Sequence, residues 1–563
     1  MSAQQFAAKA IEAAQRGDTV GALATLAEAV KAHPRESRLW HHAGSLMLKS
    51  GNAEGAVQHF GQAFALEPAN FDFAIDQAIA LTTLDRYREA LEVLATVETQ
   101  GARHAHYWST RANAARGTGD FETASKWYDR ALEIEPSRPK ALQGRATVAL
   151  ERGEEDAPTR FDKALAINQG DAQLWLGKAQ ALDVAGRPAE AREIAEALAR
   201  QFPQWLDALR LLAQLRLGMG EADFAAPFRE AAEKLPGEPG IPGEHCRQLA
   251  ALDLAEEAME VAAETRLRFP DNPHFAMLEA MQAGAAGHDE RAEAIWTSLE
   301  YDRVDRHVFE ARHWVRRKDF ARADSVLDKA LALSPWDIGG WALRDLIWRA
   351  RGDTRHEWLH GQDGLVQFLP LVDVDAVLPD AIKVLEDLHD NAHHPLGQSL
   401  RGGGTQTRGR LFDRHEPELQ ALHRSITATL AEYRNNLPPA DESHPLLRHR
   451  QSDWTIFGSW SIRFLKGGGH HKAHLHPEGL ISSACYLQLP DDLGAGGESK
   501  EGWIELGRPA PDIRLDLEPL QEIQPKIGYL ALFPSTLYHG TRKFKEGRRM
   551  TVAFDVQSKL DKQ

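Results

Sequence analysis

Apolar and small residues recur along the first 350 residues of this chain with a period of about 34 residues. In four of these periods an alanine, a large apolar residue and a second alanine stand four and three residues apart, and a proline follows five residues later. Positions i, i+4 and i+7 share one face of an α-helix, and proline ends such a helix, so each period predicts one buried helix face. The series runs Ala22, Leu26, Ala29, Pro34; Ala56, Phe60, Ala63, Pro68; Ala124, Tyr128, Ala131, Pro136; and Ala323, Leu327, Ala330, Pro335.

A glycine next to a polar residue separates two predicted helices in six of the periods. Glycine adopts the left-handed conformation that commonly follows the last residue of a helix. Units of two helices and a turn with this period resemble tetratricopeptide repeats, and we expect roughly ten of them, degenerate around residues 225–315. The glycine turns are Gly17-Asp18, Gly51-Asn52, Gly119-Asp120, Gly153-Glu154, Gly186-Arg187 and Gly352-Asp353.

A solenoid of such repeats buries apolar surface between neighbouring units and exposes a long concave groove. The groove predicts a peptide or protein partner, and a dimerisation or spacing role is the alternative that the pattern leaves open. Trp175 and Trp205 fit the groove and the packing between repeats equally well. The repeats therefore indicate binding as a class of function rather than a particular set of binding residues.

The period is lost after Trp358, where the composition changes. Apolar residues at helical spacing predict helices over 375–392 and 417–433, and Pro379 fits the first of them only within its first turn. Residues 399–409 contain three consecutive glycines and two arginines. Because this segment lacks the Gly-Lys-Ser/Thr of a phosphate-binding loop, we interpret it as a flexible loop or as a lid over a neighbouring site.

Alternation of apolar and polar residues predicts a series of β-strands near the end of the chain. Glycine- and proline-rich turns separate these strands, and a polar loop is expected over residues 489–502. Several short strands of this kind predict a barrel-like β domain, against which the two preceding helices pack. The predicted strands are 455–465, 481–489, 503–506, 527–533 and 550–556.

Three histidines and one arginine lie at the ends of these strands. His474 and His476 stand two residues apart after one apolar run, His539 follows the apolar segment 527–534, and Arg549 opens the last strand. A non-haem Fe(II) that binds a chelating cosubstrate and O2 accepts three protein ligands on one face. An arginine pairs with a carboxylate through two parallel hydrogen bonds. The pattern therefore indicates an iron site at the mouth of the β domain.

The motifs around these residues resemble those of the 2-oxoglutarate/Fe(II)-dependent dioxygenases. The resemblance rests on His474-Leu475-His476, on Phe533-Pro534-Ser535 leading to Tyr538-His539-Gly540, and on Arg549-Met550-Thr551-Val552-Ala553-Phe554. More closely, four further motifs look like the bacterial group of tetratricopeptide-repeat proteins fused to a 2-oxoglutarate/Fe(II)-dependent oxygenase. They are Gly458-Ser459-Trp460-Ser461-Ile462-Arg463, His474 to Gly479, Ser482-Ser483-Ala484 and Gly502-Trp503-Ile504-Glu505.

This resemblance implies a multidomain chain with three parts. Residues 1–358 would form an all-α tetratricopeptide-like solenoid, and residues 359–450 a helical and loop lead-in with buttressing helices. Residues 451–563 would form a double-stranded β-helix (jelly-roll) oxygenase core.

The resemblance also implies a cofactor set and the residues that hold it. His474, His476 and His539 would bind Fe(II) and act as the catalytic residues, Arg549 and Thr551 would hold 2-oxoglutarate, and O2 would be the second cosubstrate. By analogy with other oxygenases that carry such repeats, the implied reaction is hydroxylation of a peptide or protein. The alternatives are a small-molecule oxygenase with the repeats as a scaffold, and a non-catalytic repeat adaptor with a degenerate barrel.

Two of the site assignments have a rival in the sequence. The wider family uses one carboxylate ligand, and His476-Pro477-Glu478 offers a register in which Glu478 replaces His474. Arg548 is the alternative to Arg549 as the carboxylate anchor. Residues that fit either the site or ordinary structure are His470, His471, Ser482, Tyr486 and Arg463.

Composition and charge limit the partners and the compartment. The chain has 563 residues, a formal net charge of −16 and a pI near 5.9, which disfavours nucleic acid and anionic membranes as partners. Two cysteines, Cys246 and Cys485, give neither a disulfide framework nor a metal motif. The sequence begins without a signal-peptide pattern, and no apolar run is long enough to cross a membrane. We therefore expect a cytoplasmic protein.

Overall fold

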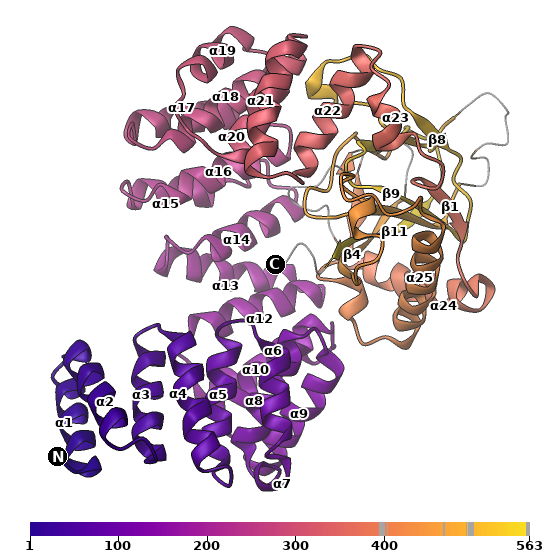
Figure 1. The fold of residues 1–563 in the computed structure, drawn as a ribbon. Helices are drawn as coiled ribbons and strands as arrows, with labels where there is room; N and C mark the ends of the chain where they lie inside the picture. Colours follow the sequence, from indigo (N-terminus) through magenta and orange to yellow (C-terminus); the bar gives the residue numbers. More distant parts are fainter. Residues whose placement is uncertain (393–399, 402, 466–467, 491–492, 494–499, 559–563) are drawn as a thin grey trace. The chain divides into compact units, whose positions relative to one another are not determined.

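The computed structural model describes residues 1–392, 400–401, 403–465, 468–490, 493 and 500–558 (Figure 1). The chain forms two compact units, residues 1–181 and residues 182–563. Among the described residues, no helix combines the length and the apolar character that crossing a membrane requires.

The first unit is built from helices that pack in consecutive pairs. Ala56, Phe60 and Ala63 are almost fully buried, and the helix that carries them ends shortly before Pro68. The periodic residues therefore form the helix contacts that the sequence predicts. The helices are α1 (Ala3–Gln15), α2 (Thr19–Ala32), α3 (Ser37–Lys49), α4 (Ala53–Leu66), α5 (Phe71–Thr82), α6 (Tyr87–Ala95), α7 (Glu98–Gly101), α8 (Ala105–Gly117), α9 (Phe121–Ile134), α10 (Pro139–Glu151), α11 (Ala157–Ile167) and α12 (Ala172–Val184), whose last residues belong to the second unit.

The predicted turn glycines all adopt the left-handed conformation, with φ between 64° and 86°. Gly51 shows why this matters, because its φ of 86° ends α3 and lets the chain reverse within two residues. Asn52 then accepts a hydrogen bond from the Gly55 backbone at 2.9 Å and caps α4. One dipeptide thus ends one helix and begins the next.

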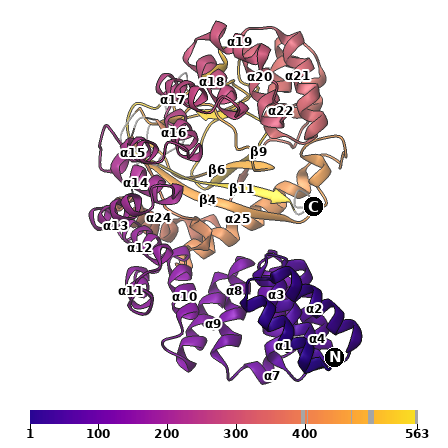
Figure 2. The same ribbon diagram turned by 90° about the vertical axis from the view of Figure 1, so that its left-hand side faces the viewer.

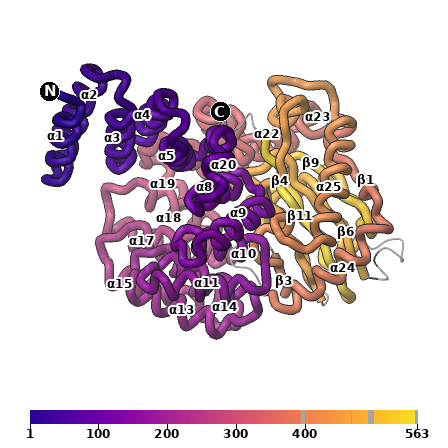
Figure 3. The backbone as a smooth tube through the Cα atoms, turned by 90° about the horizontal axis from the view of Figure 1, so that it is seen from below, coloured from indigo at the N-terminus to yellow at the C-terminus, as the bar shows by residue number. Residues whose placement is uncertain are grey.

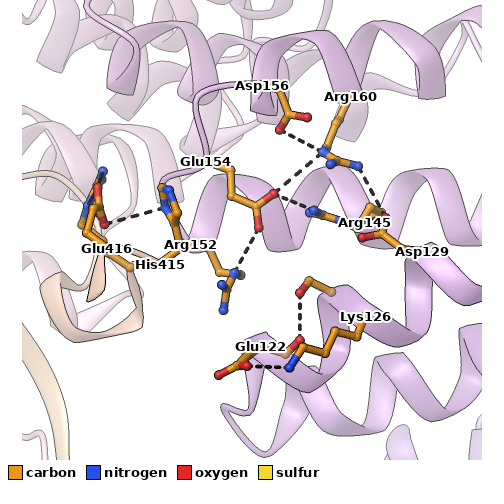
Figure 4. A network of polar contacts seen from close by, with 12 residues as sticks. Glu122, Lys126, Asp129, Arg145, Arg152, Glu154, Asp156, Arg160, His415 and Glu416 are labelled. Carbon is orange, nitrogen blue, oxygen red and sulfur yellow. Dashed lines mark hydrogen bonds and ion pairs between the residues drawn. The ribbon is translucent and has the colours of Figure 1, made fainter. Parts of the chain in front are cut away.

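A network of ion pairs around the buried side chain of Arg145 joins three successive helices of the first unit (Figure 4). Arg145 of α10 is only 6% exposed and donates to Asp129 of α9 at 2.9 Å. It also pairs with Glu154, in the turn before α11, at 2.7 Å, and Arg160 of α11 lies within 3.8 Å of the same carboxylate. Because a buried charge requires a partner, this network favours one register between neighbouring helices.

The second unit begins with the continuation of the solenoid. The segment that is degenerate in sequence, residues 225–315, consists of regular helices in the same alternating order. The helices are α13 (Pro188–Gln201), α14 (Leu206–Gly218), α15 (Ala226–Lys234), α16 (Gly240–Ala251), α17 (Ala255–Arg268), α18 (Pro273–Ala286), α19 (Asp289–Ser298), α20 (Val304–Arg316), α21 (Phe320–Leu333), α22 (Ile338–Ala350) and α23 (Arg355–His360).

Antiparallel sheets follow the helices, as the sequence predicts. A six-stranded sheet has the order β1-β9-β6-β11-β4-β3, a three-stranded sheet has the order β10-β7-β8, and β2 pairs with β5. Figure 2 shows the central strands β9, β6, β11 and β4 of the large sheet. The strands are β1 (Gln367–Pro370), β2 (Leu400–Arg401), β3 (Gly404–Gln406), β4 (Trp454–Phe464), β5 (His470–His471), β6 (Ile481–Gln488), β7 (Ile504–Leu506), β8 (Gln521–Ile523), β9 (Tyr529–Pro534), β10 (His539–Thr541) and β11 (Arg549–Ser558).

The large sheet has a different layer on each face. On one face, Met550, Val552 and Phe554 of β11 share a core with helices α24 (Val374–Asp390) and α25 (Pro417–Asn436), which lie alongside the sheet (Figures 2 and 3). On the other face, a second core joins β6 and β9 to β7 and β8 of the small sheet. Since side chains alternate along a strand, the even-numbered residues of β11 face the helices and the odd-numbered ones face inward.

Two predictions about the lead-in segment were wrong. Pro379 is the sixth residue of α24, beyond the first turn, and it is tolerated because the carbonyl group that loses its hydrogen bond belongs to the exposed residue Asp375. The predicted loop over 399–409 contributes β2 and β3, which pair with β5 and β4. Within the two predicted loops, residues 399, 402, 491–492 and 494–499 lie outside the described residues.

The last repeats share a core with the sheets of the second unit. Trp314 of α20 and Leu346 of α22 belong to the same buried cluster as Ile513 and Tyr538. Asp512 accepts two hydrogen bonds from Arg312 of α20, at 2.6 and 2.9 Å. Repeat residues therefore complete one side of the sheet region.

Candidate metal centre

Three histidine rings converge at the edge of the small sheet. His474 and His539 form a backbone bridge, each accepting the other's amide at 3.0 Å, and His476 follows two residues later on the same face. The ring centroid of His539 lies 4.3 Å from that of His474 and 4.8 Å from that of His476. One nitrogen from each ring lies within 4.8 Å of the others. The sequence-predicted trio is thus brought together.

In His474 and His539, the hydrogen bond that Nδ1 donates determines which ring nitrogen remains free. Nδ1 of His474 donates to the carbonyl of Lys472 at 2.9 Å, and Nδ1 of His539 donates to the carbonyl of Leu537 at 3.2 Å. A carbonyl oxygen only accepts, so both neutral rings carry their lone pair on Nε2. The free nitrogens are therefore the ones that a metal ion would use.

Burial favours the neutral form of His474 and His539. Burial, followed by the charge of His476, lowers the pKa of His474 to about 3. Burial likewise holds the pKa of His539 well below its ordinary value, and the neighbouring His474 adds to this shift. A neutral imidazole is the form that ligates a metal.

The donor set fits a transition-metal ion. Nε2 of His474 lies 3.1 Å from Nε2 of His476, so the two nitrogen atoms are close enough to contact one cation. Three imidazole nitrogens suit Fe(II), and also zinc, copper or nickel, so the geometry selects the class of metal and not the element.

A carboxylate supports the third ligand. Oδ1 of Asp555 lies 2.5 Å from Nδ1 of His476, and its side chain is 12% exposed. Asp555 shares the inward face of β11 with Arg549 and Thr551, and a β-bulge follows it. The even spacing of Arg549, Thr551 and Asp555 along the strand could have indicated that Asp555 faces the site. The motifs alone did not point to Asp555.

A buried arginine lies on the same inward face. Arg549 is 4% exposed and donates to the carbonyl of Gly502 at 2.8 Å. Its guanidinium lies 5.5 Å from the ring centre of Tyr486, whose hydroxyl is buried without a hydrogen-bond partner. Burial lowers the pKa of Arg549. Within the described part of the chain no carboxylate pairs with Arg549, so the arginine and the hydroxyl fit a carboxylate supplied by a ligand.

The rival residues lie elsewhere. Glu478 is exposed and does not belong to the histidine cluster. The side chain of Arg548 is 65% exposed and lies 3.6 Å from Glu386. Arg463 points to the helix face of the large sheet and pairs with Asp390 at 2.8 Å.

The remaining candidates have structural partners. Ser482 shares a hydrogen bond with Ser535 at 2.9 Å, inside the domain. The ring of His470 contacts the carbonyl of Gly468 at 3.1 Å. The ring of His471 stacks on His474 with centroids 5.9 Å apart, next to the cluster but outside it.

A turn of the solenoid also reaches the segment before the histidines. Asp253, between α16 and α17, has a φ of 63° and binds both Arg401 of β2 and Lys472. The carbonyl of Lys472 is the acceptor for His474. Sequence reasoning missed this contact, because the two segments are separated by more than two hundred residues and no local pattern connects them.

Family comparisons match both halves of this architecture. The family described as "Putative 2OG-Fe(II) oxygenase" matches residues 458–555, which contain the three histidines, Arg549 and Asp555. Two tetratricopeptide-repeat families match residues 47–114 with 155–215 and residues 105–138. The chain carries tetratricopeptide repeats and a 2OG-Fe(II) oxygenase domain. The family of the oxygenase domain implies Fe(II) and 2-oxoglutarate, and the repeats belong to a class that mediates contacts between proteins.

The similar curated proteins match limited parts of the chain. Protein FlbA from Caulobacter vibrioides is 27% identical over 205 residues, which cover 36% of this chain and 34% of FlbA. The Hsp70-Hsp90 organizing protein from Triticum aestivum is 33% identical over 104 residues, 18% of each protein. The chain thus matches about a third or less of the length of these relatives.

Similar solved structures are repeat proteins. A tetratricopeptide repeat protein from Parabacteroides merdae is 20% identical, with a TM-score of 0.36, over 43% of this chain and 97% of its own. PilW, a type IV pilus biogenesis factor, is 19% identical, with a TM-score of 0.34, over 37% of this chain and 96% of its own.

Proposed function

We propose that this chain is an Fe(II)- and 2-oxoglutarate-dependent dioxygenase that hydroxylates a peptide or protein recruited by its repeats. The observation that carries the proposal is the convergence of three histidine rings beside a buried arginine that lacks a carboxylate partner among the described residues. Metal binding alone would require only the three histidines. The buried arginine supports, in addition, an anionic cosubstrate.

In this proposal His474, His476 and His539 hold Fe(II). The bound ion and its cosubstrates supply the oxidising chemistry of the family, in which 2-oxoglutarate is decarboxylated to succinate as a substrate C–H bond is oxidised. The protein keeps each ring in one orientation through the hydrogen bonds of its Nδ1 atom. Phe533, whose ring centre lies 4.8 Å from that of His539, provides an apolar wall that limits the access of water.

Arg549 and Thr551 would hold the far carboxylate of 2-oxoglutarate. Both side chains face inward from β11 and are nearly buried, at 4% and 8% exposure. We add Tyr486 to this set, because a carboxylate there would accept the hydrogen bond that its hydroxyl lacks. Burial raises the pKa of Tyr486 to about 12, so the hydroxyl remains a donor at neutral pH.

We further propose that the two facing sheets form a double-stranded β-helix. The strand order of the large sheet, the apolar core that it shares with β7 and β8, and the position of the histidines at one open edge support this assignment. Such a closed arrangement brings ligands from distant segments to one ion.

The test is succinate formation without added substrate. The full chain, loaded anaerobically with Fe(II), should convert 2-oxoglutarate to succinate when air is admitted. His539→Ala should abolish this activity, and His470→Ala is the matched control, because His470 lies outside the cluster. Absence of both iron binding and succinate would favour a non-catalytic repeat adaptor.

The substrate class needs a separate measurement. A peptide or protein substrate should gain one oxygen atom, detected by mass spectrometry, only when Fe(II), 2-oxoglutarate and O2 are all present. A gain confined to small metabolites would favour the small-molecule alternative.

A further inference from the structure

A cavity of about 720 Å3 lies against the metal-binding segment in the second unit. Its solenoid wall comes from α20 and from the start of α22, with Val308, Phe309 and Leu343 among the apolar residues. The opposite wall is Leu475, Pro477 and Tyr538. The cavity is therefore bounded by the last repeats on one side and, on the other, by the two segments that carry the three histidines.

The cavity and the histidine cluster occupy opposite faces of the same two backbone segments. Leu475 stands between His474 and His476, and Tyr538 directly precedes His539. Leu475 and Tyr538 belong to the core shared with the last repeats, whereas the histidine rings meet each other. An occupant of the cavity is thus separated from the metal centre by the thickness of one backbone strand.

This separation suits an extended polypeptide. Passing around one strand requires roughly 10 Å, which about three extended residues span. A chain anchored in the cavity could therefore pass the exposed residue Pro477 and present a neighbouring residue to the histidines. A small molecule that fills the cavity alone would not reach them.

The charges in the cavity favour a cationic anchor. Three carboxylates line it, from Asp302, Asp305 and Asp337, against Arg303 and Arg312. Arg312 donates hydrogen bonds of 2.6 and 2.9 Å to Asp512, a carboxylate outside the cavity lining that also pairs with Arg316. Arg303 pairs with Asp305 at 3.2 Å. The other two carboxylates, Asp302 and Asp337, have no arginine partner among the described residues, although Asp302 contacts the ring of His307 at 2.7 Å.

Asp337 is the better placed of these two carboxylates. It accepts a hydrogen bond from the Gly340 backbone at 2.6 Å, at the start of α22. Burial raises its pKa above the ordinary value, and no cationic side chain of the described residues pairs with it. A basic side chain of a ligand would supply the missing counter-charge, and its aliphatic stem would contact the apolar wall.

We propose that this cavity anchors a lysine or arginine side chain of an extended polypeptide substrate, next to an apolar residue, and thereby places a residue about three positions away at the metal centre. The inference rests on the proposed oxygenase function, and it adds the substrate class. The repeats would then take a direct part in substrate selection, through α20 and α22.

The experiment compares two arrays of random nonapeptides with a fixed central pair, Leu-Lys in one and Leu-Glu in the other, probed with the labelled full chain. The Leu-Lys array should bind about tenfold more strongly at low salt, and the difference should shrink at high salt. Asp337→Asn should reduce this preference about tenfold, because asparagine keeps the helix cap but removes the charge. Equal binding to both arrays, or no binding to either, would overturn the inference.

Two further variants separate the charge effect from unfolding. Asp302→Asn changes a carboxylate that is 82% exposed and should also weaken the preference for lysine. Asp328→Asn, on the neighbouring helix α21 and 72% exposed, lies outside the cavity and should leave the preference unchanged. Loss of the preference in Asp328→Asn as well would overturn the assignment to this cavity.

Succinate formation without peptide is measured on the same samples. Succinate without a preference for basic peptides would overturn only the anchoring inference. A preference for basic peptides that responds to Asp337→Asn, without iron-dependent succinate, would support the anchor and overturn the proposed oxygenase function.

Discussion

Asp555 contacts His476 through an Oδ1 to Nδ1 distance of 2.5 Å, and it does so from the strand that also carries Arg549. A site of three imidazoles has no negative charge of its own, so it holds a divalent cation less tightly than a site with a carboxylate ligand. A carboxylate one hydrogen bond away raises the basicity of the ligating ring. Asp555 thus places a negative charge next to the metal ligands without being a ligand itself.

Replacing this carboxylate should weaken metal binding without removing a ligand. Asp555→Ala should reduce the affinity for Fe(II), or for Co(II) as a spectroscopic probe, by roughly ten- to a hundredfold. Titration of the apo-protein measures this affinity directly. Asp390→Ala, at the end of α24, removes the partner of Arg463 and is the control, which should bind the metal as the unaltered chain does.

The two adjacent arginines give a matched pair for the cosubstrate site. Arg549→Ala should raise the 2-oxoglutarate concentration needed for half-maximal succinate formation roughly tenfold to a hundredfold, since a charge-assisted hydrogen bond contributes about 1.5–3 kcal/mol. Arg548→Ala removes an exposed side chain and should have little effect. A similar change in both variants would refute the assignment of Arg549. Metal affinity should be retained in each.

Two variants test whether His474 or Glu478 is the metal ligand. His474→Ala removes a ring whose free Nε2 lies in the cluster, and it should change the electronic spectrum of bound Co(II) and lower its affinity at least tenfold. Glu478→Ala removes an exposed carboxylate and should leave the spectrum unchanged. The reverse result would assign the third ligand to Glu478.

Acid should loosen the junction between the last repeats and the sheets. Burial opposes the ionisation of Asp512, but Arg312 and then Arg316 outweigh it and hold the pKa of this carboxyl well below its ordinary value. A lowered pKa in the folded state means that the pair stabilises the protein above about pH 4, the ordinary range of the group, and that this stability is lost as the pH falls further.

Thermal unfolding between about pH 7 and about pH 3 measures this effect. Asp512→Asn should lower the melting temperature at pH 7 and should flatten its fall towards acid pH. Asp328→Asn, an exposed carboxylate of α21, serves as the control and should keep the slope of the unaltered chain. An unchanged slope in Asp512→Asn would contradict the prediction.

Local patterns predicted the helices and the main strands. The alanine spacing around Phe60 works because small residues recur wherever two helices approach closely. His474 and His539 could be connected only through motifs, because their contact depends on a backbone bridge that periodicity does not encode.

Other features depended on tertiary contacts that no local pattern contains. Gly404 to Gln406 form an edge strand because β4 offers a free edge, although their composition favours a loop. Pro379 lies inside a helix because the packing of Leu378 and Leu385 outweighs one lost hydrogen bond. Asp253 became visible as a partner of Lys472 only once the chain was folded. The domain boundaries at residues 358 and 450 stay a prediction.

The cluster that joins Trp314 and Leu346 to Ile513 and Tyr538 limits how this chain can be divided. A protein shortened to residues 359–563 would expose the apolar side of Tyr538 to water, one residue from a proposed iron ligand. Any exchange of the terminal repeats must therefore preserve the apolar side chains that pack against Ile513 and Tyr538.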